Sequence, residues 1–218
     1  GPAPGRGAPA PPPTPRPPGR GPLAAAAPLD AAARLLTTVE YTASDTGRQA
    51  RVDLLRGRLA FLRRTDERGP AFVLRAARHL ADLDPERSRD CFLDALEMSL
   101  VVGRATGVMD RVLAEARSAP QSSTPDVLDA LTRLAADGHR AAYPLMRSVL
   151  DGDTTPLWTR RPALAAMLAS ELWDPHTHAT IADWLVRTGR DSGSPHLLRL
   201  GLAQSASYAV LTGELGRA

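Results

Sequence analysis

The sequence contains no lysine and no asparagine, and all 27 of its basic residues are arginine. The lack of lysine excludes a Schiff base, the G-x-x-x-x-G-K-[ST] phosphate loop and the ATP-binding lysine of protein kinases. We therefore expect this chain to bind no ATP and to carry no cofactor of its own. The single isoleucine, Ile181, adds to a pattern that avoids AT-rich codons and indicates a genome of high GC content.

Cysteine and long apolar runs are also scarce. Cys91 is the only cysteine, so the chain can form no internal disulfide. It stands inside a predicted helix, where we expect a small buried core residue and not a catalytic thiol. No apolar run approaches the roughly 20 residues that a membrane-spanning helix needs, and the N-terminus does not resemble a secretory signal. We expect a reduced, cytoplasmic protein that makes no membrane contact.

Aromatic residues make up only 4% of the chain, and alanine and leucine dominate its apolar residues. This composition suits close packing between helices better than packing between β-sheets, so the predicted class is all-α. The pI near 9.7 accompanies a net charge of only +3, because 24 acidic residues are interspersed among the arginines. Such a mixture is typical of solvated helix faces, and we expect no specific nucleic-acid binding by this chain.

Residues 1–28 differ from the rest in composition. They hold 11 of the 20 prolines, with glycine, alanine and arginine between them. This composition predicts a disordered linker or tail with polyproline II character, and a ligand for an SH3 or WW domain is the alternative. Gly1 and Pro2 are also what a cleaved tag leaves behind, so the sequence leaves open whether the segment is native.

Six apolar segments of helical period open with a turn-type residue followed by proline. Proline is tolerated at the first helical position, and a preceding Asp, Thr or Ser can accept hydrogen bonds from free backbone N–H groups. Glycines at 103, 138, 189 and 213 are expected to end helices in the left-handed conformation. The six opening pairs are Gly69-Pro70, Asp84-Pro85, Thr124-Pro125, Thr155-Pro156, Asp174-Pro175 and Ser194-Pro195.

These boundary signals predict antiparallel helix pairs in series. Residues 29–66 are expected to form a helical hairpin capped at Asp30, and residues 67–218 a set of degenerate repeats that stops inside its last unit. Pair starts about 30 to 55 residues apart bracket the 34-residue tetratricopeptide period, so we expect a tetratricopeptide-like solenoid. The helices are expected over 48–64, 70–83, 85–102, 108–117, 125–137, 140–150, 156–173 with a restart at Pro162, 175–190 and 195–212.

Histidines are the main candidates for metal ligands. His176 and His178 follow Asp174, but residues two apart on a helix point about 200° from each other and cannot chelate from one face. We expect both to be surface residues of a first helical turn. His79 and His139 are isolated and are expected near helix ends. No catalytic or metal site follows from these residues, and we expect a protein that is not an enzyme.

The three tryptophans and the last helix bear on recognition. Trp158, Trp173 and Trp184 are expected to fill gaps between helices, with ligand stacking as the alternative. The helix over 195–212 carries apolar residues on two faces, and two such faces require two neighbours. We therefore expect homo-oligomer formation or a docked tail through this helix. The two faces hold Leu198, Leu202 and Ala209 on one side, and Leu197, Leu200, Tyr208 and Leu211 on the other.

Three stretches, Leu74–Arg104, Ala169–His176 and Leu185–Ser194, carry a family resemblance. From about Arg51 onward the chain resembles the central region of large actinobacterial regulators that have an ATPase module before it and a LuxR-type helix-turn-helix after it. The resemblance implies a transcriptional activator whose helical-repeat region senses an effector or partner protein. ATP is then expected only in the upstream module. A free-standing helical-repeat adaptor unrelated to transcription is the alternative, and the residues of the recognition groove stay unknown.

Overall fold

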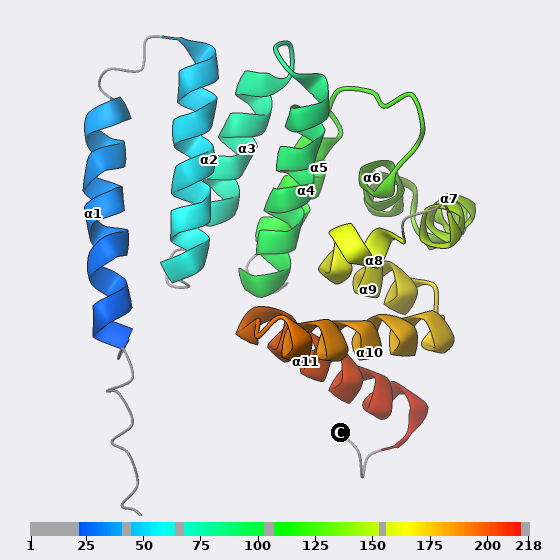
Figure 1. Cartoon of the computed structure of the whole chain (residues 1–218). Helices are drawn as coiled ribbons and strands as arrows, with labels where there is room; N and C mark the ends of the chain where they lie inside the picture. Colours follow the sequence, from blue (N-terminus) through cyan, green and yellow to red (C-terminus); the bar gives the residue numbers. More distant parts are fainter. Residues whose placement is uncertain (1–21, 41–44, 64–67, 103–106, 153–155, 215–218) are drawn as a thin grey trace, which may run out of the picture.

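The computed structural model describes residues 22–40, 45–63, 68–102, 107–152 and 156–214. Within these ranges all regular structure is α-helical and no strand occurs, which confirms the all-α class (Figure 1). The helices are α1 (Pro22–Glu40), α2 (Thr46–Arg63), α3 (Gly69–Leu80), α4 (Pro85–Val102), α5 (Val108–Ala116), α6 (Val127–Asp137), α7 (His139–Asp151), α8 (Leu157–Arg160), α9 (Pro162–Glu171), α10 (Pro175–Asp191) and α11 (Pro195–Thr212).

Most of the predicted helix starts are confirmed. Proline occupies the first turn of α3, and α4, α10 and α11 each begin at a proline. The side chain of Asp174 accepts a hydrogen bond from the backbone N–H of Thr177 at 3.0 Å, which caps α10. Ser194 caps α11 in the same way, accepting from the N–H of Leu197 at 3.4 Å. These caps satisfy backbone donors that have no partner inside the helix.

The first helix begins earlier than predicted. Helix α1 starts at Pro22, so the last part of the segment expected to be a linker is helical, and Asp30 lies inside the helix and does not cap it. Four consecutive alanines at 24–27 have the highest helix propensity of any residue, which offsets the neighbouring prolines. The remainder of the predicted linker, residues 1–21, lies outside the described residues.

The start predicted at Pro125 is wrong. Helix α6 begins at Val127, and Asp126 is its N-cap. Asp126 accepts from the backbone N–H of Asp129, whose side chain accepts in turn from the N–H of Asp126 at 2.9 Å. The buried Arg89 binds both carboxylates at 2.7 and 2.8 Å, and so fixes this capping box against α4.

The segment over 156–173 is divided into two helices, as the proline at its centre predicts. Arg161 separates α8 from α9 with φ −134° and ψ 63°, because a residue before proline is driven out of the helical conformation. Thr155, predicted to cap this segment, lies outside the described residues.

Of the four glycines expected to end helices in the left-handed conformation, Gly213 does so at the end of α11, with φ 79° and ψ 10°. Gly138 ends α6, but its φ of 79° and ψ of 178° are outside the left-handed helical region, and Gly103 lies outside the described residues. Gly189 is inside α10, which contradicts the prediction. A Cβ at Gly189 would lie 2.5 Å from the backbone nitrogen of Leu198, so only glycine lets α10 and α11 approach this closely. Gly201 of α11 makes the reciprocal approach to α10.

Successive helices pack against one another along most of the chain, and the buried residues form a continuous core. Figure 1 shows α1 to α5 side by side, while α10 and α11 run across the lower part of the molecule. Helix α4 also packs against α9, although four helices separate them in sequence. In an open solenoid each unit contacts only its neighbours. The α4–α9 contact therefore folds the later helices back onto the earlier ones. In the described part of the chain no helix is long and apolar enough to cross a membrane.

Candidate functional site

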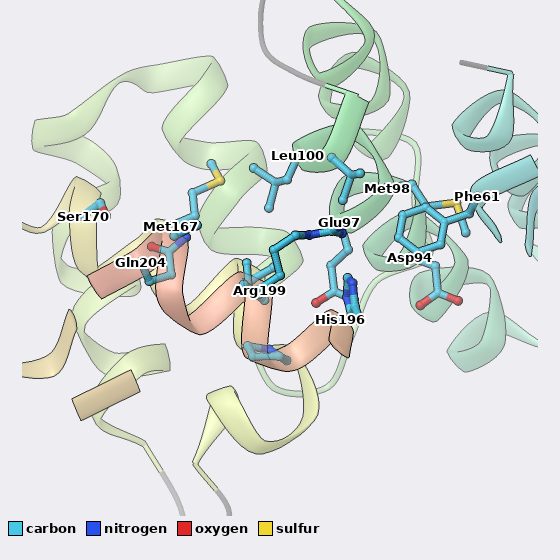
Figure 2. A pocket seen from close by; sticks show the side chains of 15 residues that line it. Phe61, Asp94, Glu97, Met98, Leu100, Met167, Ser170, His196, Arg199 and Gln204 are labelled. Carbon is cyan, nitrogen blue, oxygen red and sulfur yellow. The ribbon is translucent and has the colours of Figure 1, made fainter. Parts of the chain in front are cut away.

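A cleft of about 1000 Å³ lies where the early and late helices meet. Four helices supply its walls: α2, α4, α9 and α11. Figure 2 shows their side chains converging on the cavity from these separate elements. The residues that line it are Phe61, Asp94, Glu97, Met98, Leu100, Val101, Pro162, Ala163, Met167, Ser170, His196, Arg199, Leu200, Ala203 and Gln204.

The larger part of the lining is apolar. Met98 and Leu100 of α4 face the cavity opposite Met167 of α9. Methionine is unbranched and polarizable, so it adapts to ligands of different shape. At one edge the rings of Phe61 and His196 meet edge to face, with centroids 6.1 Å apart. This contact joins the end of α2 to the start of α11.

The α4 wall is acidic. Asp94 and Glu97 are 30% and 26% exposed, and both accept hydrogen bonds from the Arg161 guanidinium, which is only 17% exposed. Arg161 also lies 3.2 Å from the Asp90 carboxylate on the same helix. Burial raises the pKa of Glu97, and the positive charge of Arg161 opposes this change. One arginine therefore holds the α8–α9 junction to three carboxylates of α4.

The α11 wall carries a different charge. Arg199 lines the cleft and is exposed, and among the described residues no carboxylate lies within ion-pair distance of its guanidinium. Gln204 lies one turn further along α11, and Figure 2 shows both side chains directed to the cavity. The two walls thus present opposite charges to the cleft.

A buried histidine lies behind the polar end of the cleft. His178 is 2% exposed, and its Nδ1 lies 3.2 Å from the hydroxyl of Ser170, which lines the cavity. Its Nε2 makes no well-aligned hydrogen bond among the described residues, although Gln204 of α11 lies next to the ring. Burial lowers the pKa of His178, and the adjacent Gln204 opposes this effect. The prediction of a surface residue is wrong here because α11 covers this side of α10, whereas His176 is exposed as predicted.

The remaining candidate residues lie apart from one another. Cys91 is buried, as predicted, and burial raises the pKa of its thiol to about 12. His79 is in the last turn of α3, 3.9 Å from the buried carboxylate of Asp53. His139 begins α7 and lies 3.2 Å from the carboxylate of Glu171. In the described ranges no group of three His, Cys, Asp or Glu side chains could hold a metal ion.

The prediction for the tryptophans is confirmed for two of the three. Trp158 and Trp184 are partly buried against the core, but Trp173 is 80% exposed and has a φ of 51°. The backbone N–H of Trp173 donates to the carbonyl of Ser170, and the backbone N–H of Asp174 donates to the carbonyl of Ala169. These two bonds form the Schellman pattern that ends a helix. The residue at this position must be left-handed, and its side chain is directed away from the core. Gly193 occupies the same position after α10.

Helix α11 has fewer free apolar residues than its sequence suggests. Leu197 and Leu200 pack against the core, Ala209 is buried and Leu198 is half-buried beside Gly189. Three large side chains on this helix are more than half exposed: Leu202, Val210 and Leu211.

The sequence did not indicate the residues that define the cleft. Phe61, Arg161 and Arg199 are far apart in the chain, and each is an ordinary helix-surface residue by pattern. The one local signal was the Arg161-Pro162 step, which marks a helix break but does not identify its partners. No family model, no curated protein and no solved structure matches this chain.

Proposed function

We propose that this chain is a non-catalytic sensor or scaffold whose cleft between α4 and α11 binds an effector or a partner protein. The observation that supports the proposal most directly is the cleft itself, with its apolar lining and a few charged side chains on facing walls. This composition is typical of ligand-binding cavities. The ion pairs of Arg161 beside it join α4 to the α8–α9 junction and stabilise the fold.

The cellular role that we propose is that of a region of a transcriptional activator in the cytoplasm. The resemblance to LuxR-type regulators supports it, as does the succession of packed helices, which fits a tetratricopeptide-like stack closed by the α4–α9 contact. Repeat stacks of this kind usually present a recognition surface. The nucleotide-binding and DNA-reading functions would then belong to other modules of the parent protein.

The test fills the cleft without changing the buried core. Ala203 of α11 is exposed at the cleft, and the variant Ala203→Trp places an indole in the cavity. Ala135→Trp, at an exposed position of α6, is the matched control. Transcript profiles of the source strain carrying either variant should show loss of a defined set of transcripts for Ala203→Trp alone. Unchanged transcripts in both strains would contradict the regulatory role.

A free-standing adaptor is the second candidate, favoured by the exposed Trp173 beside the cleft-bearing helices. Solvent-exposed tryptophan is enriched at protein interfaces. The adaptor would be supported if gene deletion leaves transcription unchanged, and if the gene lacks both an upstream phosphate-loop sequence and a downstream helix-turn-helix.

A further inference from the structure

We infer that the cleft binds a zwitterionic ligand with an apolar body, of the class of short apolar peptides. Its ammonium group would lie against Asp94 and Glu97 and its carboxylate against Arg199. This inference rests on the proposed function, because it names the ligand class of the same cleft.

The α4 wall has an excess of negative charge. Asp90, Asp94 and Glu97 share one guanidinium, that of Arg161, so the four groups together are negative. An ionised carboxylate has about four acceptor positions, and Arg161 occupies only some of them. Because Asp94 and Glu97 are 30% and 26% exposed, they can still accept from an ammonium group in the cleft.

The α11 wall supplies the opposite charge. Arg199 has no carboxylate partner among the described residues and projects into the cavity (Figure 2). A guanidinium binds a carboxylate through two parallel hydrogen bonds, which fixes the orientation of the ligand. A ligand with one cationic and one anionic end therefore matches both walls, whereas a simple anion would be repelled by α4.

The space between the walls is apolar and of suitable size. Met98, Leu100, Met167 and Leu200 line the same cavity as the charged residues. The cavity of about 1000 Å³ is at the upper end of the range for small-molecule sites, which leaves room for about two or three apolar residues. Met98 and Met167 can adjust to different side chains, so the apolar part need not be of one sequence.

The polar end of the cleft can serve a peptide group. Ser170 and Gln204 offer a hydroxyl and an amide at the cavity surface. Behind them the Nδ1 of the buried His178 lies 3.2 Å from the Ser170 hydroxyl, and Gln204 lies next to the same ring. These contacts hold the two polar groups at the cavity surface, where they can pair with a peptide group of the ligand.

The experiment uses calorimetric titration of the whole chain with Leu-Phe and Leu-Leu-Phe, each with free ends, with only the amine acetylated, with only the carboxyl amidated and with both blocked. We expect the free peptides to bind about tenfold more tightly than either singly blocked form, and the doubly blocked form to bind weakest. Glu97→Gln should remove the advantage of the free amine, and Arg199→Gln that of the free carboxylate. Arg187→Gln, an exposed change on α10, is the control.

Equal affinity for all four forms, or no binding of either peptide, overturns the inference. If peptides fail to bind but Ala203→Trp still abolishes the transcript response, the cleft is functional and its ligand belongs to another class. If peptides bind as expected and transcription does not depend on the protein, the ligand class holds and the regulatory role is wrong. If both Glu97→Gln and Arg199→Gln still bind peptides with free termini more tightly than blocked peptides, the peptide binds outside the cleft.

Discussion

Replacing Arg161 by methionine should lower the free energy of unfolding by about 2–3 kcal/mol at pH 7. Removing one partner of a buried ion pair costs about 3–5 kcal/mol, because the other charge is left without compensation. The value here is smaller, since Asp94 and Glu97 keep some contact with water and Asp90 is 69% exposed, so its pair with Arg161 is screened by solvent. Methionine preserves most of the apolar stem that packs at the α8–α9 junction.

The pH dependence of this variant separates lost charge from lost packing. Without Arg161 the positive charge that opposes the effect of burial on Glu97 is lost, so the pKa of Glu97 should rise further above its ordinary value. The folded variant then binds more protons than the unfolded one as the pH falls, so its deficit should shrink between pH 7 and about pH 5. Urea unfolding of wild type, Arg161→Met and the exposed-site control Arg111→Met at several pH values measures the free energy of unfolding of each, and so the deficit of Arg161→Met. A loss below about 0.5 kcal/mol, or a pH-independent loss, would refute the reasoning.

Five further outcomes follow from the structure. Trp173→Gly should raise stability by about 0.5–1 kcal/mol in thermal unfolding, and Gly193→Ala should lower it by about 1 kcal/mol, because both positions require a left-handed backbone. Burial holds the pKa of His178 below its usual 6.5, so wild type should lose stability as the pH falls below about 6.5, and His178→Gln should not show this step. The Thr177 backbone N–H and Arg147 hold the pKa of Asp174 at about 2, so the stability deficit of Asp174→Ala should be full above pH 4 and narrow toward pH 2 in acid titration. With a thiol pKa of about 12, Cys91 should react with a disulfide reagent only as fast as the chain unfolds.

Local chemistry explains which elements could be predicted. The prolines that open α3, α4, α10 and α11 act through their own missing N–H groups and the caps before them, so the signal lies within a few residues. Two errors arose where one local signal outweighed another. The alanines at 24–27 extend α1 toward the N-terminus, and the capping box of Asp126 and Asp129 starts α6 after Pro125. A third error arose from a distant residue. Gly189 was expected to end a helix, but the demand for glycine there comes from the backbone of Leu198 across the α10–α11 contact.

The cleft could not be predicted because its walls are brought together by packing between non-adjacent helices. Arg161 and Asp94 are separated by most of the middle of the chain, and no spacing rule connects them. Periodicity places a residue on a helix face but does not say which other helix that face will meet. His178 illustrates the limit, since its position in a first turn indicated exposure and only the return of α11 buries it.

The contacts between early and late helices also influence how the molecule unfolds. A stack in which each helix touches only its neighbours can fray from either end, one unit at a time. Here the ring of Phe61 in α2 contacts that of His196 in α11, and Arg161 binds the carboxylates of α4, so the later helices are linked to the earlier ones at two points. Amide hydrogens in α2 and α11 should exchange with solvent in one cooperative opening, and a ligand that bridges α4 and α11 should slow the exchange of both.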